Sequence, residues 1–151
     1  MSFQQRNVIV TLVNFSLILA FLVIRVVLMV AGGSFNPTQV FRLWGIVIVL
    51  AVFVTIFATT LTHIVYAIIQ AIRTGEQNSK LEDFEDERDQ LINLRGTRIT
   101  YLVSSIGAFL SMLTFVLGQP PLVMFTLLIF SGVVAQIVGD LSRLYLYRRG
   151  F

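Results

Sequence analysis

ITYLVSSIGAFLSMLTFVLGQPPLVMFTLLIFSGVVAQIVG, residues 99–139, is the stretch that decides the fold, because none of its 41 side chains is charged. A bilayer core about 30 Å thick is crossed by about 20 apolar helical residues, so the stretch can hold two crossings. Gly118-Gln119-Pro120-Pro121 interrupts it with a strong turn signal that lacks two backbone donors. The stretch therefore predicts two membrane-spanning helices, at about 99–117 and 122–147, joined by a tight turn.

Two more uncharged stretches lie nearer the N-terminus. Between Arg6 and Arg25 there are 18 residues, and between Arg42 and Arg73 there are 30. In lipid such long apolar runs are helices, because each backbone group must bond within its own segment. They predict spans at about 8–31, an uncleaved anchor, and at about 42–72. The latter is too long for a perpendicular crossing and must tilt or extend beyond the bilayer.

The composition places the whole chain in the membrane class. Hydrophobic residues make up 56% of the 151 residues and charged residues 13%, too little to cover so apolar a volume in water. Cysteine is absent, which excludes disulfides, thiolate metal sites and cysteine nucleophiles. The net charge of +3 is too small to indicate nucleic-acid binding. We therefore predict one transmembrane domain, residues 1–151, with the all-α fold of an integral membrane four-helix bundle.

The positions of the basic residues predict the orientation. Four spans put the N-terminus, the 74–98 loop and the C-terminus on one side, with nine of the eleven lysines and arginines. The other side has Arg25 and Arg42, which we expect to snorkel to the interface. The positive-inside rule assigns the side with nine cations to the cytoplasm. We therefore expect both termini, and a helical extension between the second and third spans, to be cytoplasmic.

Small residues recur every three or four positions in three of the predicted spans, and they let membrane helices approach closely. Together with the Pro-Pro turn, they predict that the third and fourth spans form an antiparallel hairpin. The stripes are Ser104, Gly107, Ser111, Thr114 and Gly118 in the third span, Ser131, Ala135 and Gly139 in the fourth, and Ala51, Thr55, Thr59 and Thr62 in the second.

The 74–98 loop holds the clearest pattern outside the spans. Gly75 can end the second span, and Ser79-Lys80-Leu81-Glu82 matches a capping box that opens a helix leading into the third span. Two interpretations are open: a solvated, charged helix, and a docking surface for a basic cytoplasmic partner. The docking acids would be Glu82, Asp83, Glu85, Asp86, Glu87 and Asp89.

The same loop carries a family resemblance. Asp86-Glu87-Arg88-Asp89, followed by Leu91-Ile92 and then by a span, resembles a short motif in small four-span predicted membrane proteins of bacteria and archaea. The resemblance covers the loop and the third span. It implies a prokaryotic origin, and hence a bacterial cytoplasmic (inner) membrane, but no biochemical activity and no functional residues.

Polar side chains inside the spans are the default place to look for function. Five of them lie in the cytoplasmic third of their spans, so the bundle could gather them in one layer. They could form interhelical hydrogen bonds, worth about 0.6 kcal/mol each, or a ligand or ion site. These residues are Asn14, His63, Ser104, Ser105 and Gln136.

Two further features of the spans concern single side chains. Asp140 and Arg143 are spaced to pair at the end of the fourth span. His63 is the only histidine and could be an axial ligand to a haem or to a chlorophyll magnesium, although a lone histidine is more often simply hydrogen-bonded.

The residue types present in the chain exclude several classes of membrane protein. Disulfide–quinone oxidoreductases need cysteine pairs, two-haem cytochromes need several histidines, and small multidrug exporters need an acid where this chain has Asn14. We therefore predict a protein that is not an enzyme, with no catalytic residue, no metal site and no required cofactor. Two functions remain: an accessory or scaffolding subunit of a larger membrane complex, and a homo-oligomeric transporter or channel with Asn14, His63 and Gln136 along its pathway. The expected partners are the lipid bilayer and other membrane subunits or further copies of the chain.

Overall fold

The structure is a computed structural model that describes residues 3–74 and 87–149. These residues form four helices, α1 (Phe3–Ala31), α2 (Pro37–Thr74), α3 (Glu87–Val116) and α4 (Pro121–Arg149). Each helix is long and apolar enough to span a membrane, which confirms the predicted all-α class with four spans. Within the helices, the side chains of residues 3, 58, 59, 61–63, 65–67 and 69–74 lie outside the described part.

Three helices begin well before the spans that the charge pattern predicted: α1 at Phe3, α2 at Pro37 and α3 at Glu87. The Asn36 side-chain oxygen accepts a hydrogen bond from the Gln39 amide (3.0 Å), so Asn36 caps α2 and Pro37 takes its first position. α3 starts at Glu87, because charged residues end an apolar run without ending a helix. The predicted helix before the third span is thus confirmed over 87–98, whereas Gly75 and the capping box at Ser79 lie outside the described residues.

The length of α2 agrees with the expectation that this helix exceeds the bilayer. Its 38 residues correspond to about 57 Å of helix, against about 30 Å of hydrocarbon.

Both described turns end a helix in the same way. Gly33 and Gly118 have positive φ angles of 64° and 85°, which a side chain would disfavour. The next amide then reaches back to the helix, from Ser34 to the Met29 carbonyl (2.9 Å) and from Gln119 to the Thr114 carbonyl (3.1 Å). The predicted turn at 118–121 is therefore confirmed, and each turn reverses the chain within a few residues.

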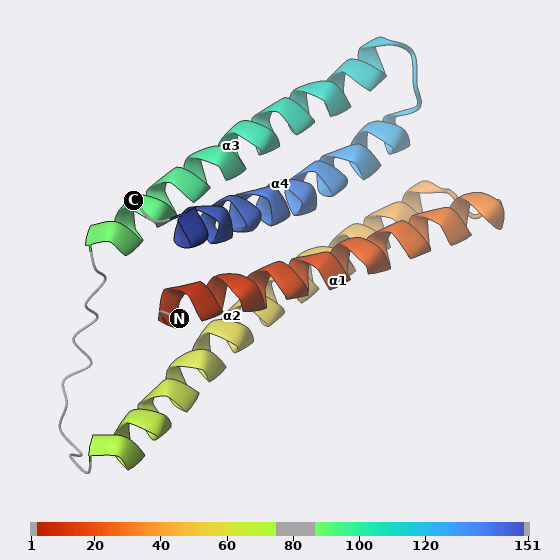
Figure 1. Cartoon of the computed structure of the whole chain (residues 1–151). Coiled ribbons are helices and arrows are strands. Elements are labelled where there is room, and N and C mark those ends of the chain that lie inside the picture. Colours follow the sequence, from red (N-terminus) through yellow and green to blue (C-terminus); the bar gives the residue numbers. More distant parts are fainter. Residues whose placement is uncertain (1–2, 75–86, 150–151) are drawn as a thin grey trace.

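The four helices form two hairpins that pack in series (Figure 1). α3 packs mainly against α4, α4 also packs against α1, and α1 packs against α2. Both short turns lie at one end of the molecule, and both marked chain ends lie at the other. The first and last helices of the chain are therefore neighbours and join the two hairpins.

The α3–α4 hairpin is the most closely packed pair, as the small-residue stripes predicted. A Cβ atom added to Gly107 would collide with the Ser131 side chain, and one added to Gly139 would collide with the side chain of Thr100. Ala135 is buried between the helices. The two backbones thus approach so closely that only a hydrogen atom fits at these glycines.

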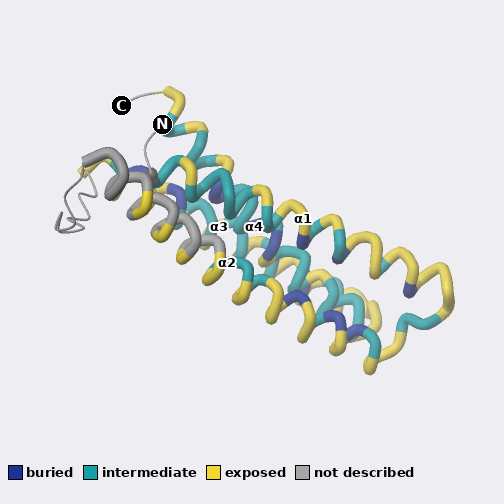
Figure 2. The backbone as a smooth tube through the Cα atoms, turned by 90° about the horizontal axis from the view of Figure 1, so that it is seen from below, coloured by how far each residue is buried: buried dark blue, intermediate teal, exposed yellow. Residues whose placement is uncertain are grey.

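A small apolar core holds the other helices together. It consists of Ile18, Leu22 and Met29 of α1, Leu43 and Val47 of α2, and Val133 of α4. The outward sides of the helices are exposed in Figure 2 and carry large apolar side chains. Apolar side chains are well solvated by lipid, so an apolar outer surface is what a membrane protein requires.

Candidate functional site

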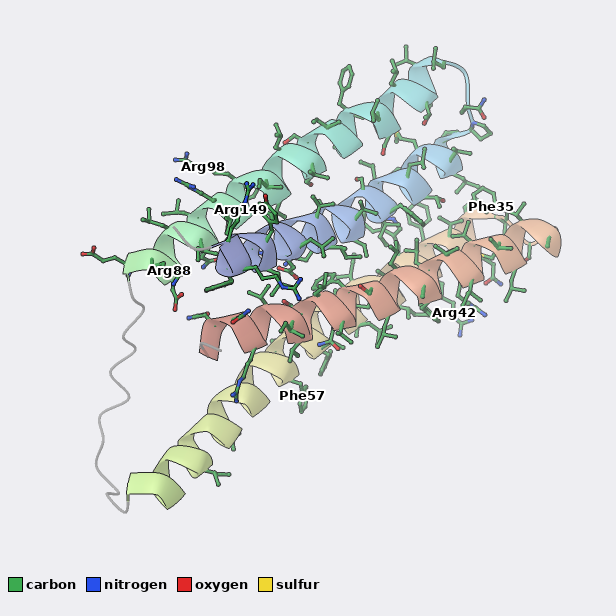
Figure 3. The ribbon with its side chains drawn as sticks, viewed as in Figure 1. Phe35, Arg42, Phe57, Arg88, Arg98 and Arg149 are labelled. Atoms are coloured by element: carbon green, nitrogen blue, oxygen red, sulfur yellow. The ribbon has the colours of Figure 1, made fainter. Side chains whose placement is uncertain are left out.

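The described charges are segregated between the two ends of the molecule. Figure 3 places Arg88, Arg98 and Arg149 at the end that holds the chain termini, and Arg42 near the opposite end. We call the former the basic end. The polar network described next lies in the half of the α3–α4 hairpin nearest to it.

A buried ion pair is the centre of this network. Arg143 Nη1 donates to Asp140 Oδ1 at 2.6 Å, which confirms the predicted pairing within α4. The prediction placed this pair at the membrane interface, at the end of the fourth span, and the structure shows in addition that it is buried: the Asp140 side chain is only 2% exposed and that of Arg143 only 12%. Gln136, one helical turn before Asp140, donates to the same oxygen at 3.2 Å.

The arginine of this pair also bonds to α3. Its Nε donates to the Asn93 side-chain oxygen (3.2 Å) and its Nη2 donates to the Thr97 hydroxyl (3.0 Å). Gly96 makes room for the arginine stem, because a Cβ atom there would overlap it. The guanidinium therefore holds the two helices together through polar contacts in a region where apolar contacts provide no drive for association.

α1 completes the surroundings of the carboxylate. The Thr11 side chain lies beside Asp140, but its hydroxyl donates to the backbone carbonyls of Asn7 (3.2 Å) and Val8 (3.0 Å). Two buried acceptors, Asp140 Oδ2 and Asn7 Oδ1, have no hydrogen-bond donor within 3–74 and 87–149. A buried acceptor without a donor is uncommon, so the surroundings of Asp140 Oδ2 are a candidate site for a small donor group.

The predicted polar layer is only partly assembled. Asn14, Ser104 and Gln136 are half-buried, whereas Ser105 is exposed on the outer surface of α3. No hydrogen bond connects these four residues to one another in the part of the chain that the structure describes, and Gln136 bonds to Asp140 instead. The side chain of His63 lies outside the described residues, so its role as a layer member or as a pigment ligand stays a prediction.

The predicted docking acids are described at only two positions. Glu87 is exposed and Asp89 is half-buried, both in the first turn of α3, where the helix dipole favours negative charge. Glu82, Asp83, Glu85 and Asp86 lie outside the described residues. Within the described ranges, no three acids or histidines come together as a metal site would require.

Sequence reasoning missed the residues that α1 and α3 bring to the ion pair. Asn93, Gly96, Thr97 and Thr100 follow one another at helical spacing of three and four, which puts them on one face of α3. A polar face of this kind indicates a buried charged partner. The sequence analysis overlooked it because most of these residues belong to the segment predicted as the cytoplasmic loop.

Comparisons of the chain with protein-family models, with characterised proteins and with solved structures find no match. The family resemblance of the 86–92 motif therefore stays a prediction, and any functional inference has to come from the site itself.

Proposed function

We propose that this protein is a non-enzymatic accessory or scaffolding subunit of a larger membrane complex. Its membrane would be a bacterial cytoplasmic membrane, with the basic end facing the cytoplasm. The observation that carries the proposal is that the buried charges of α4 contact other side chains of the bundle. Asp140 and Arg143 are engaged with each other and with Asn93 and Thr97, as expected of a device that fixes helix positions.

The packing of α3 supports the same proposal. α3 rests mainly on α4 and exposes large apolar side chains along the rest of its length, including Leu102 (62% exposed) and Phe109 (66%). A helix held on one side can offer its remaining surface to another subunit without any change in the bundle. Exposed Glu87 at the start of α3 would extend this surface beyond the membrane toward a basic partner.

The experiment that tests the proposal is native mass spectrometry of the tagged chain, extracted from its own membrane in mild detergent. Other subunits in a fixed stoichiometry are the expected result. A homo-oligomer without other subunits would contradict it. An absorbance spectrum of the same sample tests the His63 prediction, since a bound haem or chlorophyll absorbs visible light.

The docking acids can be tested in the same preparation. Changing Asp86 and Glu87 to Ala should lower the amount of co-purifying partner, because two charges that attract a basic surface are lost. The matched control exchanges the two acids, Asp86→Glu with Glu87→Asp, and keeps both charges. Equal recovery from both variants would show that the acids are not a docking surface.

The proposed orientation can be measured separately, because the chain has no cysteine of its own. Single cysteines at Ser34 and Gln90 should react differently with a membrane-impermeant maleimide added to intact cells. We expect Ser34→Cys to be labelled and Gln90→Cys to be protected, and the reverse result would invert the topology.

A second candidate function, transport by a homo-oligomer, is favoured by one observation. Asp140 Oδ2 and Asn7 Oδ1 are buried acceptors without a donor among the described residues, as a pathway for a cation or a polar solute would need. Flux into liposomes containing the purified chain tests it, with Asn14→Leu and His63→Leu as variants. A flux that equals that of empty liposomes would exclude this function.

A further inference from the structure

The two oxygens of the Asp140 carboxyl group have very different surroundings. Oδ1 accepts from Arg143 Nη1 at 2.6 Å and from Gln136 Nε2 at 3.2 Å. Oδ2 is buried and has no hydrogen-bond donor among the described residues. A guanidinium commonly binds a carboxylate with two parallel N–H···O bonds, one to each oxygen. Here its other nitrogens donate to Asn93 and Thr97, so the arginine leaves Oδ2 without a donor.

A hydroxyl group next to this carboxyl offers it an acceptor and no donor. The Thr11 side chain of α1 lies beside Asp140. Its single hydroxyl proton is directed at the backbone carbonyls of Val8 (3.0 Å) and Asn7 (3.2 Å), so its oxygen presents only lone pairs to other neighbours. Two acceptors side by side are stabilised when a hydrogen atom lies between them. A proton on Oδ2 supplies that atom, because a protonated carboxyl donates from one oxygen and accepts at the other.

The surroundings favour a proton over a metal ion. A bound metal ion needs several ligands, and no three acids or histidines gather within the described part of the chain. The Asp140 side chain is 2% exposed, so a charge on it is stabilised by protein groups alone, and a proton removes that charge.

Arg143 is the charged group that acts on Asp140 among the described residues. The side chains and backbone with which α1 and α3 contact this part of α4 do not titrate; they belong to Thr11, Gly96, Thr97 and Thr100. The other described charges of α1, α2 and α3 lie at exposed positions or in the first turn of α3; they are Arg6, Arg25, Arg42, Glu87, Arg88, Asp89, Arg95 and Arg98. A change in the charge of Asp140 is therefore felt mainly by Arg143.

We propose that Asp140 is a reversible proton-binding site inside the fourth span, with the proton on Oδ2 and directed at the Thr11 hydroxyl oxygen. The proton comes from water at the basic end, and its uptake forms one O–H bond and breaks no covalent bond of the protein. Oδ1 keeps its hydrogen bonds from Arg143 and Gln136 in both forms. Proton uptake weakens the attraction between Asp140 and Arg143 and adds a hydrogen bond between α4 and α1. Such a site is compatible with either function proposed above and depends on neither.

The test is infrared difference spectroscopy of the full chain in lipid vesicles, because a protonated carboxyl has a C=O stretching band that a carboxylate lacks. The sequence makes the assay selective: seven of the eight acids lie within 76–89, and Asp140 is the eighth. We expect one such band at a mildly acidic pH at which the other seven acids are ionised. The band should disappear when the pH is raised and return when it is lowered. Asp140→Asn should abolish it, and its amide keeps an acceptor for Arg143 and a donor for Thr11.

Thr11→Val should weaken proton binding roughly fivefold, the effect of one neutral hydrogen bond, and thus move the transition to lower pH. The matched control is Thr126→Val, which removes a half-buried hydroxyl of α4 that donates to the Leu122 carbonyl and should leave the transition unchanged.

Three results would overturn the proposal. The first is the absence of the band, or its persistence in Asp140→Asn. The second is a shift to higher pH in Thr11→Val, which would mean that the hydroxyl donates to an ionised carboxylate. The third is loss of the band when sodium or potassium ions replace choline at equal ionic strength, which would assign the site to a metal cation.

Discussion

Replacing Arg143 by Met is the most informative perturbation of this structure. The substitution keeps an unbranched side chain of similar length in α4 but removes the guanidinium that contacts Asp140 at 2.6 Å. It also removes the hydrogen bonds to Asn93 and Thr97 that tie α4 to α3. Asp140, whose side chain is 2% exposed, would then be a buried carboxylate that keeps the hydrogen bond from Gln136 but has lost its countercharge.

The expected loss follows from these contacts. Removing one partner of a buried ion pair lowers the free energy of unfolding by about 3–5 kcal/mol, because the other charge stays buried and uncompensated. Both side chains are well below one-third exposed, so water does not screen the pair as it would at a surface. The two interhelical hydrogen bonds contribute about 1 kcal/mol together, within that range.

The assay is reversible unfolding of the purified chain in mixed micelles of increasing denaturing detergent. Trp44, the only tryptophan, gives the signal, because its indole donates to the Phe125 carbonyl (3.1 Å) and reports the contact between α2 and α4. The double variant Asp140→Leu/Arg143→Met removes both charges and should recover most of the lost stability. A loss below about 1 kcal/mol for Arg143→Met, typical of exposed pairs, would refute the reasoning. So would a double variant less stable than the single one.

Two further predictions concern glycines. Gly139→Ala should lower the free energy of unfolding by about 1–3 kcal/mol, because the added Cβ would overlap the Thr100 side chain. Gly132→Ala is the control, since there is open space around Gly132, and it should leave the free energy of unfolding unchanged in the same detergent titration. Gly118→Ala should lower the free energy of unfolding by about 1–2 kcal/mol, because the backbone φ of 85° is unfavourable for alanine. The control is Gly45→Ala, at a position with open space around it and no positive φ, and the two variants are compared by thermal unfolding. Equal unfolding midpoints would contradict the turn geometry.

The four helices were predictable because one physical quantity, the length of uncharged apolar sequence, determines what can cross a bilayer. The turn at Gly118 and the close contact of Gly107 with Ser131 followed from equally local signals. Helix ends were less predictable. α2 starts at Pro37 because of a cap at Asn36, and α3 continues to Glu87 because charged residues do not interrupt backbone hydrogen bonding.

The site was predictable only within one helix. Asp140 and Arg143 are spaced to pair wherever α4 lies, so sequence spacing was sufficient for that contact. The contacts to Asn93 and Thr97 depend on how α3 is rotated and how deep it sits beside α4, and spacing carries no such information. The predicted polar layer illustrates this.

Ser104 and Ser105 are adjacent and point about 100° apart around a helix, so both cannot face the bundle. Ser105 is the one that faces outward. A polar residue in a span is therefore evidence for a polar contact only when its helical neighbours on the same face are known to be covered.

The contact between α1 and α4 has a consequence for the biosynthesis of the protein. α1 leaves the ribosome before α4, so the contact between them can form only after α4 has been made. The face of α1 that carries Thr11 must wait in the membrane without the helix that later covers it. Each hairpin is closed by its own short turn, so a gene divided between α2 and α3 should still yield two halves that recognise each other.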